Sequence, residues 1–324
     1  MKPLMETIDL VKHFPVGKTF FTEARSFVRA VDGVSLALGE GKSSALVGES
    51  GCGKTTLGRL ILRFLEPTSG NILFDGIDIS KLNGQELKDL RKRMQMIFQD
   101  PTASLNPRKT VSQAIGQPLQ IHRSINKSEL REHVFQLLDA VGLTPPELFA
   151  ERLPHELSGG QRQRVVIARA VALHPKFVVA DEPVSALDVS VRAQILNLMK
   201  ELGDRMGLTY LLITHDLAVA RSMCMKVFVM YLGEIVETAG TEDVFNNPLH
   251  PYTKALISAS PIPDPETTRV KKRMVLQGDV PSPINVPSGC RFRTRCSRAS
   301  ARCVEKPVLK EISTGHYVAC FLHY

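Results

Sequence analysis

A glycine-rich segment near the N-terminus has the residue types and spacing of a phosphate-binding turn. Residues 48–55 read Gly-Glu-Ser-Gly-Cys-Gly-Lys-Thr, which fits the pattern G-x-x-x-x-G-K-[ST]. The backbone N–H groups of such a turn, and the positive end of the helix after it, face the phosphates of a nucleotide. We therefore predict a nucleotide site formed by Gly48, Glu49, Ser50, Gly51, Cys52, Gly53, Lys54, Thr55 and Thr56. In this site Lys54 contacts the β- and γ-phosphates, and the Thr55 hydroxyl binds Mg²⁺.

Two carboxylates follow an apolar run further along the chain. Residues 177–180 read Phe-Val-Val-Ala, which predicts a buried strand, and Asp181 and Glu182 come directly after it. We predict that Asp181 holds Mg²⁺ through water and that Glu182 is the general base that polarises the attacking water. An acidic pair alone is usually structural. Its place downstream of a phosphate-binding turn favours nucleotide hydrolysis.

The elements that must position these residues alternate between strand and helix patterns. The apolar run 43–47 leads into the glycine-rich turn, and residues 55–65 have helical spacing. We expect further buried strands at 94–98 and 208–214, antiparallel edge strands at 5–11 and 31–38, and a hairpin that turns at residues 232–234. Between Asp100 and Pro154 the pattern is helical, with an amphipathic stretch at 128–143. This order predicts an α/β fold with a mainly parallel sheet and a helical insert.

Composition narrows the class of protein. The sequence has no run of 18 uncharged apolar residues and no apolar segment at its N-terminus, so we expect no membrane span and a cytoplasmic location. The net charge of +8 is concentrated in residues 269–310, which hold eleven Lys or Arg and two Asp or Glu. A nucleic-acid patch, a solvated face, a contact with anionic lipid and a counter-charge for an anionic centre all fit this pattern.

Four of the six cysteines lie in the last 35 residues, with the spacing C-x5-C-x6-C-x16-C. Clustered cysteines in a reducing cytosol favour a metal over disulfides, although four unligated thiols remain an alternative. The spacing matches neither a zinc ribbon nor the usual ferredoxin pattern. The other two are Cys52, which we expect to be a reactive thiol beside Lys54, and Cys224, which we expect to pack in the core.

The order of the motifs resembles that of the ABC ATPase family. Residues 157–161 read Leu-Ser-Gly-Gly-Gln, which is similar to the signature sequence of that family. The phosphate-binding turn and Gln99 precede this segment, and the acidic pair, residues 185–188 and His215 follow it, as in the family. The resemblance covers residues 5–250. It implies a P-loop (RecA-like) nucleotide-binding domain at 1–250, with an antiparallel β edge and a helical subdomain at about 100–170, and a small Cys-containing C-terminal module at 251–324.

The resemblance also implies roles for further residues. Gln99 would bind Mg²⁺ or the attacking water, His215 would hydrogen-bond the γ-phosphate, and Asp188 would couple two sites. The signature would contact the γ-phosphate of ATP held by the opposite subunit through Ser158, Gly159, Gly160 and Gln161. A helix N-terminus suits this task because it binds anions. Two chains would therefore clamp two nucleotides head to tail.

An aromatic residue near the N-terminus should stack on adenine. Alignment of residues 11–14, Val-Lys-His-Phe, with the start of the family favours Phe14. The less favoured candidates are Phe20, Phe21 and Phe27. Ordinary packing of Phe14 is the alternative.

The C-terminal part narrows the resemblance to one subgroup. Residues 246–261 and 276–296 look like the C-terminal region of ATP-binding subunits of dipeptide/oligopeptide importers, and 98–111 are similar to the same subgroup. In that subgroup four tail cysteines hold a [4Fe-4S] cluster, which the resemblance places on Cys290, Cys296, Cys303 and Cys320. Zn²⁺ is the competing metal. Five nearby arginines are expected to surround the cluster, where they would offset its charge and lower the thiol pKa values. These arginines are Arg291, Arg293, Arg295, Arg298 and Arg302. We expect a structural rather than a redox role.

The resemblance implies an ATPase that powers import of di- or oligopeptides. Its expected partners are a second, paralogous ATPase subunit, two transmembrane permeases and an extracytoplasmic solute-binding protein, with no nucleic acid. The chain would lie peripherally on the cytoplasmic face of the inner membrane. The alternative is an importer of an opine, glutathione, a nickel chelate or an oligosaccharide.

Three other classes fit the sequence less well. A chromosome-maintenance ATPase would carry long coiled coils between Lys54 and Ser158, where this chain has about 100 residues without heptads. A translation-type ABC protein would carry two cassettes in one chain. An iron–sulfur enzyme would need a pocket for a second substrate.

Overall fold

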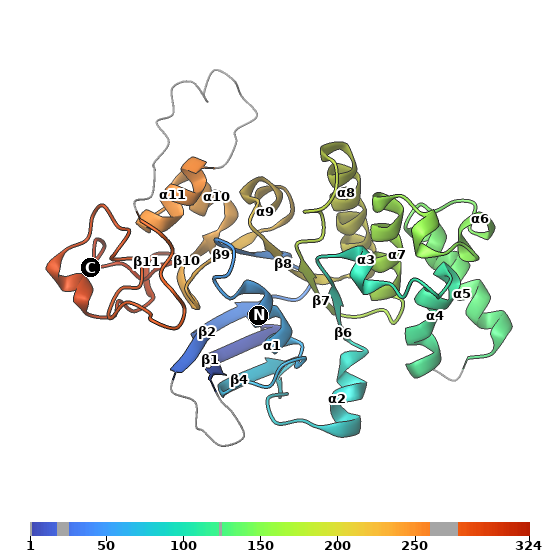
Figure 1. The fold of residues 1–324 in the computed structure, drawn as a ribbon, viewed down its shortest axis with the longest axis horizontal. Helices are drawn as coiled ribbons and strands as arrows, with labels where there is room; N and C mark the ends of the chain where they lie inside the picture. The colour runs from blue at the N-terminus through green and yellow to red at the C-terminus, as the bar shows by residue number, and fades with distance from the viewer. Residues whose placement is uncertain (1, 18–25, 123–124, 260–277) are drawn as a thin grey trace. The chain divides into compact units, whose positions relative to one another are not determined.

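The computed structural model describes residues 2–17, 26–122, 125–259 and 278–324 (Figure 1). The chain divides into two compact units. The first unit contains Met1–Leu38, Ser43–Ser80 and Leu212–Tyr324, and the second contains Gly39–Lys42 and Lys81–Leu211. No helix in these described ranges has both the length and the apolar character that a bilayer span requires.

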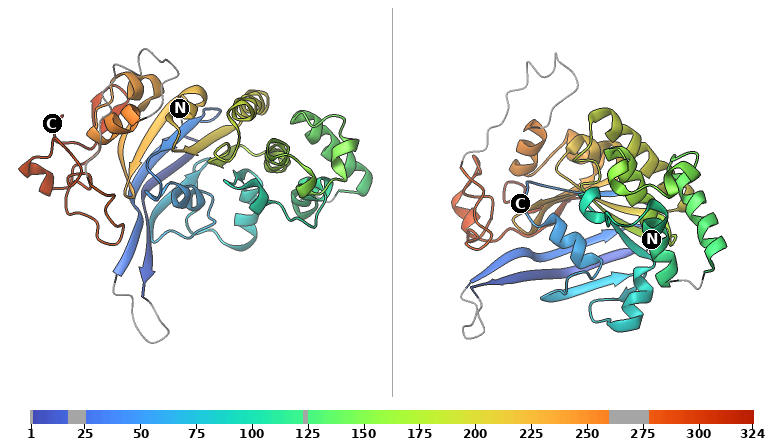
Figure 2. Two further views of the ribbon diagram at one scale, coloured as in Figure 1. Left: turned by 45° about the horizontal axis from the view of Figure 1, so that its top comes forward. Right: turned by 45° about the vertical axis from the view of Figure 1, so that its right-hand side comes forward.

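The first unit contains an antiparallel sheet with strand order β2-β1-β4-β5. Its strands are β1 (Met5–Val16), β2 (Ser26–Leu38), β4 (Ser69–Phe74) and β5 (Ile77–Asp78). Along the end of β2, Val34, Leu36 and Leu38 are buried while the residues between them are exposed, which is the period of two that turns one face of a strand to the core. Figure 2 shows β1 and β2 side by side. The expected antiparallel edge is confirmed.

A second set of strands in the first unit carries the phosphate-binding turn. The strands are β3 (Ser44–Val47), β9 (Lys226–Tyr231), β10 (Glu234–Gly240), β11 (Lys310–Ser313) and β12 (His316–Val318). Strand β3 pairs in parallel with β9, and β9 pairs antiparallel with β10. The hairpin turns at Leu232 (φ 42°) and Gly233 (φ 84°), the two positive φ angles that a type I′ turn requires. The predicted hairpin is therefore confirmed.

The C-terminal strands extend this sheet. Strand β12 pairs antiparallel with β10, and β11 pairs with β12. Neither strand was predicted from the sequence, because each has only three or four residues and β11 is exposed along its whole length. The helices of this unit are α1 (Lys54–Ile61), α9 (Leu217–Met223), α10 (Thr241–Asn246), α11 (Pro251–Ala259) and the 3₁₀ helix η2 (Ala301–Val304).

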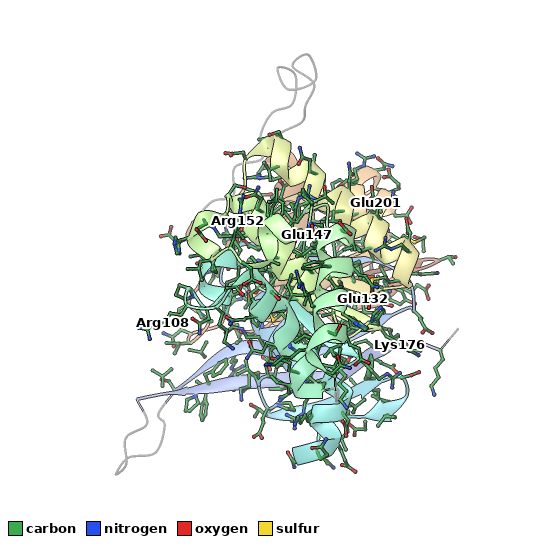
Figure 3. The ribbon with its side chains drawn as sticks, turned by 90° about the vertical axis from the view of Figure 1, so that its right-hand side faces the viewer. Arg108, Glu132, Glu147, Arg152, Lys176 and Glu201 are labelled. Atoms are coloured by element: carbon green, nitrogen blue, oxygen red, sulfur yellow. The ribbon has the colours of Figure 1, made fainter. Side chains whose placement is uncertain are left out.

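The second unit is mainly helical. Its helices are α2 (Gly84–Arg91), α3 (Pro101–Ser104), α4 (Val111–His122), α5 (Lys127–Ala140), α6 (Glu147–Ala150), η1 (Pro154–Glu156), α7 (Gly159–Val171) and α8 (Val189–Met206). Figure 3 shows Glu132, Glu147 and Glu201 projecting from α5, α6 and α8, and all three are exposed. The expected helical insert after Asp100 is confirmed.

Local sequence explains where α5 begins. Asn126 accepts a hydrogen bond from the Glu129 N–H (2.9 Å), and the Glu129 carboxylate accepts one from the Asn126 N–H (3.3 Å), which together form a capping box.

The apolar runs form β6 (Met94–Ile97), β7 (Phe177–Asp181) and β8 (Thr209–Thr214), as expected. Strands β6 and β7 pair in parallel, with Ile97 opposite Ala180.

Candidate nucleotide site and cysteine module

The glycine-rich turn lies between β3 and α1. Gly53 has φ 111°, and a Cβ atom there would lie 2.0 Å from the carbonyl oxygen of Ala30, so only glycine fits. The Lys54 side chain is buried, and its Nζ donates hydrogen bonds to the carbonyl oxygens of Gly48 and Glu49, both at 2.8 Å. The ammonium group is therefore held against the turn whose N–H groups are predicted to face the phosphates.

The two isolated cysteines are both buried. Burial raises the pKa of Cys52 more than the neighbouring Lys54 lowers it, so the thiol stays protonated at neutral pH. The burial and raised pKa of Cys52 therefore argue against the reactive thiol that its neighbours in the sequence suggested. Burial raises the pKa of Cys224 to about 12, and the side chain is 6% exposed. The predicted core position of Cys224 is confirmed.

The turn also makes contacts that were not predicted from the sequence. The Glu49 N–H donates to the hydroxyl oxygen of Tyr252 (2.8 Å), and Arg295 donates to both carboxylate oxygens of Glu49 (2.7 and 3.1 Å). Tyr252 and Arg295 lie 203 and 246 residues from Glu49 in the chain. No local pattern could have revealed contacts over that separation.

The acidic pair lies at the end of β7. Asp181 is 2% exposed, and the next residue, Glu182, has φ 45°, a left-handed conformation that a non-glycine residue adopts at a cost and that often occurs at functional sites. The Nε2 atom of Gln99 donates to the Glu182 carboxylate (3.0 Å). The parallel register of β6 and β7 explains this contact, because both residues follow the same ends of neighbouring strands. The structure therefore brings Gln99 and Glu182 together.

The signature segment begins helix α7. Ser158 is the N-cap, and its hydroxyl accepts from the Gln161 N–H (3.3 Å) while the Gln161 side chain accepts from the Ser158 N–H (2.9 Å). A Cβ atom on Gly160 would lie 2.7 Å from Cγ1 of Val191 on α8. Asp188 is the exposed N-cap residue of α8. The signature and Asp188 thus occupy the starts of two helices that pack together.

Two further predicted nucleotide ligands lie on or directly after strands of the fold. His215 is exposed and directly follows β8. Phe14 lies on β1 opposite Val28, with the Lys12 ammonium 5.2 Å from its ring centroid. Of the less favoured aromatic residues, Phe27 is 47% exposed, whereas Phe20 and Phe21 lie outside the described residues. The adenine contact of Phe14 stays a prediction.

The four C-terminal cysteines line one pocket. None of them is in a disulfide, and His250 and Phe292 are among the other residues that line this pocket. Within the described residues, no group of three or more His, Cys, Asp or Glu side chains is arranged to hold a metal ion. Burial, with smaller contributions from the three neighbouring thiols, raises the pKa of Cys290 to about 11. Burial also raises the pKa values of Cys296 and Cys320, so the expected lowering is wrong for these three thiols without a bound metal.

The positions of the arginines explain this error. Arg298 lines the cysteine pocket, whereas Arg295 pairs with Glu49. Arg291 is buried and donates to Asp32, and it also lies 3.2 Å from Glu234. Burial alone would raise the pKa of Asp32, but Arg291 and His13 lower it below its usual value. Two arginines thus hold carboxylates of the nucleotide-binding part rather than surrounding the cysteines.

Comparisons with known proteins agree with these features. The ABC transporter family model matches residues 31–185, and the model of the oligopeptide/dipeptide transporter C-terminal region matches 236–303. The oligopeptide transport ATP-binding protein AppF of Bacillus subtilis is 50% identical over 322 residues, covering 99% of this chain and 97% of AppF. OppF of Salmonella typhimurium, also an oligopeptide transport ATP-binding protein, is 48% identical, covering 98% and 96%.

Solved structures give the same fold. The dimeric bacterial ABC transporter cassette MJ0796 aligns with a TM-score of 0.65 and 30% identity, over 73% of this chain and 98% of that chain. A second structure of MJ0796, a dimer in a post-hydrolysis state bound to ADP and Pi, gives the same values. With its phosphate-binding turn, its signature helix and full-length relatives at about half identity, the chain belongs to the ATP-binding proteins of oligopeptide/dipeptide ABC transporters.

Proposed function

We propose that this chain hydrolyses ATP and that the hydrolysis powers import of di- or oligopeptides. The observation that carries the catalytic part is the Glu182 carboxylate, held 3.0 Å from the Gln99 amide at the ends of two parallel strands. The peptide part is supported by the two relatives described as oligopeptide transport ATP-binding proteins and by the matching C-terminal region.

In the proposed reaction Lys54 and the turn N–H groups bind the phosphates, and Glu182 takes the proton of the attacking water. The Gln99 amide orients the Glu182 carboxylate, and His215 hydrogen-bonds the γ-phosphate. Bound Mg²⁺ would supply positive charge that offsets the charge of the phosphates. Thr55, Asp181 and Gln99 would hold it, and their hydroxyl, carboxylate and amide oxygens are the hard ligands that this ion prefers.

We infer that the signature serves a second subunit. Ser158, Gly159, Gly160 and Gln161 would contact the γ-phosphate of ATP bound to a paralogous ATPase, and Asp188 would couple the two sites. The dimeric cassette with ADP and Pi supports this arrangement. The assembly would include two permeases and an extracytoplasmic solute-binding protein, which places this chain on the cytoplasmic face of the inner membrane.

We also propose that the cysteine pocket holds a [4Fe-4S] cluster, with Zn²⁺ as the competing metal. The four thiols line one pocket, and thiolates are the soft ligands that both iron–sulfur clusters and zinc favour. Ligation requires deprotonation, which a bound metal drives despite the raised thiol pKa values. The module contacts β10 and the phosphate-binding turn, which supports a structural role.

Uptake of labelled di- and tripeptides in a deletion strain tests the function. We expect wild type and Glu201→Gln, an exposed control on α8, to restore uptake and Glu182→Gln to leave it lost. Rescue by Glu182→Gln would contradict the catalytic role. If purified protein hydrolyses ATP but the deletion leaves peptide uptake unchanged, either a redundant system masks the loss or the solute is another class. Opines, glutathione, nickel chelates and oligosaccharides then form the next panel.

A further inference from the structure

The phosphate-binding turn carries an acidic residue at a position where a negative charge would weaken phosphate binding. Glu49 directly follows Gly48 in the turn, and ATP brings several negative charges to the same backbone. Glu49 is partly exposed, with 25% of its side chain accessible. A carboxylate there would weaken binding of a triphosphate unless a cation compensated it.

The cation is Arg295, which comes from the cysteine module. Its guanidinium binds both Glu49 oxygens in the forked geometry that makes arginine–carboxylate pairs strong and directional. The Arg295 side chain is 7% exposed, so solvent screens this pair less than it screens a surface pair. Glu49 raises the pKa of Arg295, and the guanidinium therefore stays charged at every physiological pH.

The surroundings of Arg295 hold it in place. Tyr231, Tyr252 and Phe292 form an aromatic cluster with ring centroids 4.7–5.4 Å apart. The Arg295 guanidinium lies 6.0 Å from the Tyr231 ring centroid. The Tyr252 hydroxyl accepts from the Glu49 N–H, so one cluster member also fixes the backbone of the turn. Glu49 is thus held at both its carboxylate and its N–H.

We propose that Arg295 is a positioning residue for nucleotide binding, which acts by neutralising Glu49 and drawing its carboxylate away from the phosphates. The inference rests on the proposed assignment of residues 48–55 as the phosphate site. It gives the C-terminal module a task at the nucleotide site. The contact also explains why Arg295, a basic residue of the tail, pairs with Glu49 and does not line the cysteine pocket.

Binding of a fluorescent ATP analogue to the purified full-length chain, together with steady-state ATPase kinetics, tests the proposal. Arg295→Ala should weaken ATP affinity about tenfold and raise KM similarly, while kcat changes less than about twofold, because Arg295 does not touch the reacting atoms. Arg293→Ala is the matched control, since this arginine of the same module bonds to Ser288 (2.9 and 3.1 Å). Arg293→Ala should leave ATP affinity, KM and kcat unchanged.

The double variant separates electrostatics from tethering. Arg295→Ala combined with Glu49→Gln removes the salt bridge as completely as Arg295→Ala does, but it leaves no free carboxylate in the turn. We expect it to restore ATP affinity to within about twofold of wild type. A double variant as weak as Arg295→Ala would mean that the salt bridge only tethers the module, and the proposal would be overturned.

A charge-conserving variant and a loop variant complete the test. Arg295→Lys should lose about two- to threefold in affinity, because a lysine keeps the charge but not the forked contact. Lys54→Ala should lose ATP binding altogether. If Lys54→Ala binds normally, the phosphate-site assignment itself fails. If Lys54→Ala loses binding while Arg295→Ala binds like wild type, the site stands and the inference about Arg295 is refuted.

Discussion

Replacing Glu237 with glutamine should destabilise the first unit. Glu237 lies on β10 and is fully buried. One carboxylate oxygen accepts from the Leu249 N–H (2.8 Å) and lies 2.7 Å from Nε2 of His316 on β12, and the other accepts from the His250 N–H (2.8 Å). This carboxylate therefore joins β10 to the start of α11 and to the C-terminal strand.

The size of the effect follows from these three contacts. A glutamine amide can replace the first oxygen, but its NH₂ group would face the His250 N–H and leave that donor unpaired, at a cost of about 1–3 kcal/mol. Loss of charge assistance in the other two contacts costs about 1 kcal/mol each. Relief of the buried charge offsets part of this sum. We expect a net loss of about 2 kcal/mol, which lowers Tm by about 4 °C in a chain of this length.

Calorimetry and hydrogen exchange measure this prediction. Amides of residues 234–240 and 316–318 should exchange faster in Glu237→Gln than in wild type. The control is Glu311→Gln, because Glu311 is exposed and accepts from the Gly315 N–H (2.8 Å) at a hairpin end, where we expect a change in Tm below about 1 °C. An unchanged or raised Tm in Glu237→Gln would show that desolvation of the carboxylate outweighs its hydrogen bonds, and the reasoning would be refuted.

Three further predictions concern catalysis, the cysteine module and pH. Glu182→Gln should lower ATP turnover about 10²–10³-fold while ATP affinity changes less than about threefold, as measured by phosphate release and analogue binding; normal turnover would exclude Glu182 as the base. Cys303→Ser should lower the iron and acid-labile sulfide content of anaerobically purified protein, whereas the control Ser297→Ala should not. Zinc without iron in the purified wild type would favour Zn²⁺ over a [4Fe-4S] cluster. Burial, with a smaller contribution from His323, lowers the pKa of His250 to about 3. Between this pH and about 6.5 the unfolded state therefore binds a proton that the folded state does not, so stability should fall as the pH drops through this range. Denaturant unfolding at pH 7 and at pH 5.5 measures this loss in free energy of unfolding. The loss should be about 1 kcal/mol smaller in His250→Asn than in the wild type, and an equal loss would contradict the lowered pKa of His250.

Much of the local structure is predictable because its causes are local. The apolar runs become strands, and the Leu232-Gly233 turn closes a hairpin because both residues adopt positive φ. The Leu-Ser-Gly-Gly-Gln segment begins a helix because Ser158 and Gln161 cap each other within four residues. The strands β11 and β12 escape prediction because they are short and depend on pairing with a distant strand.

The residue types and order of the nucleotide motifs, the alternation of strands and helices, and the grouping of four cysteines near the C-terminus can all be read from the sequence. Which carboxylates the tail arginines bind depends on the packing of distant segments. Five arginines beside the cysteines suggested counter-charges for a cluster, yet Arg291 and Arg295 bind carboxylates contributed by distant segments of the first unit. Likewise, burial raises the pKa of Cys52, although its neighbours in sequence suggested a reactive thiol. Pairing and desolvation depend on what packs around a group, and sequence spacing alone does not specify that.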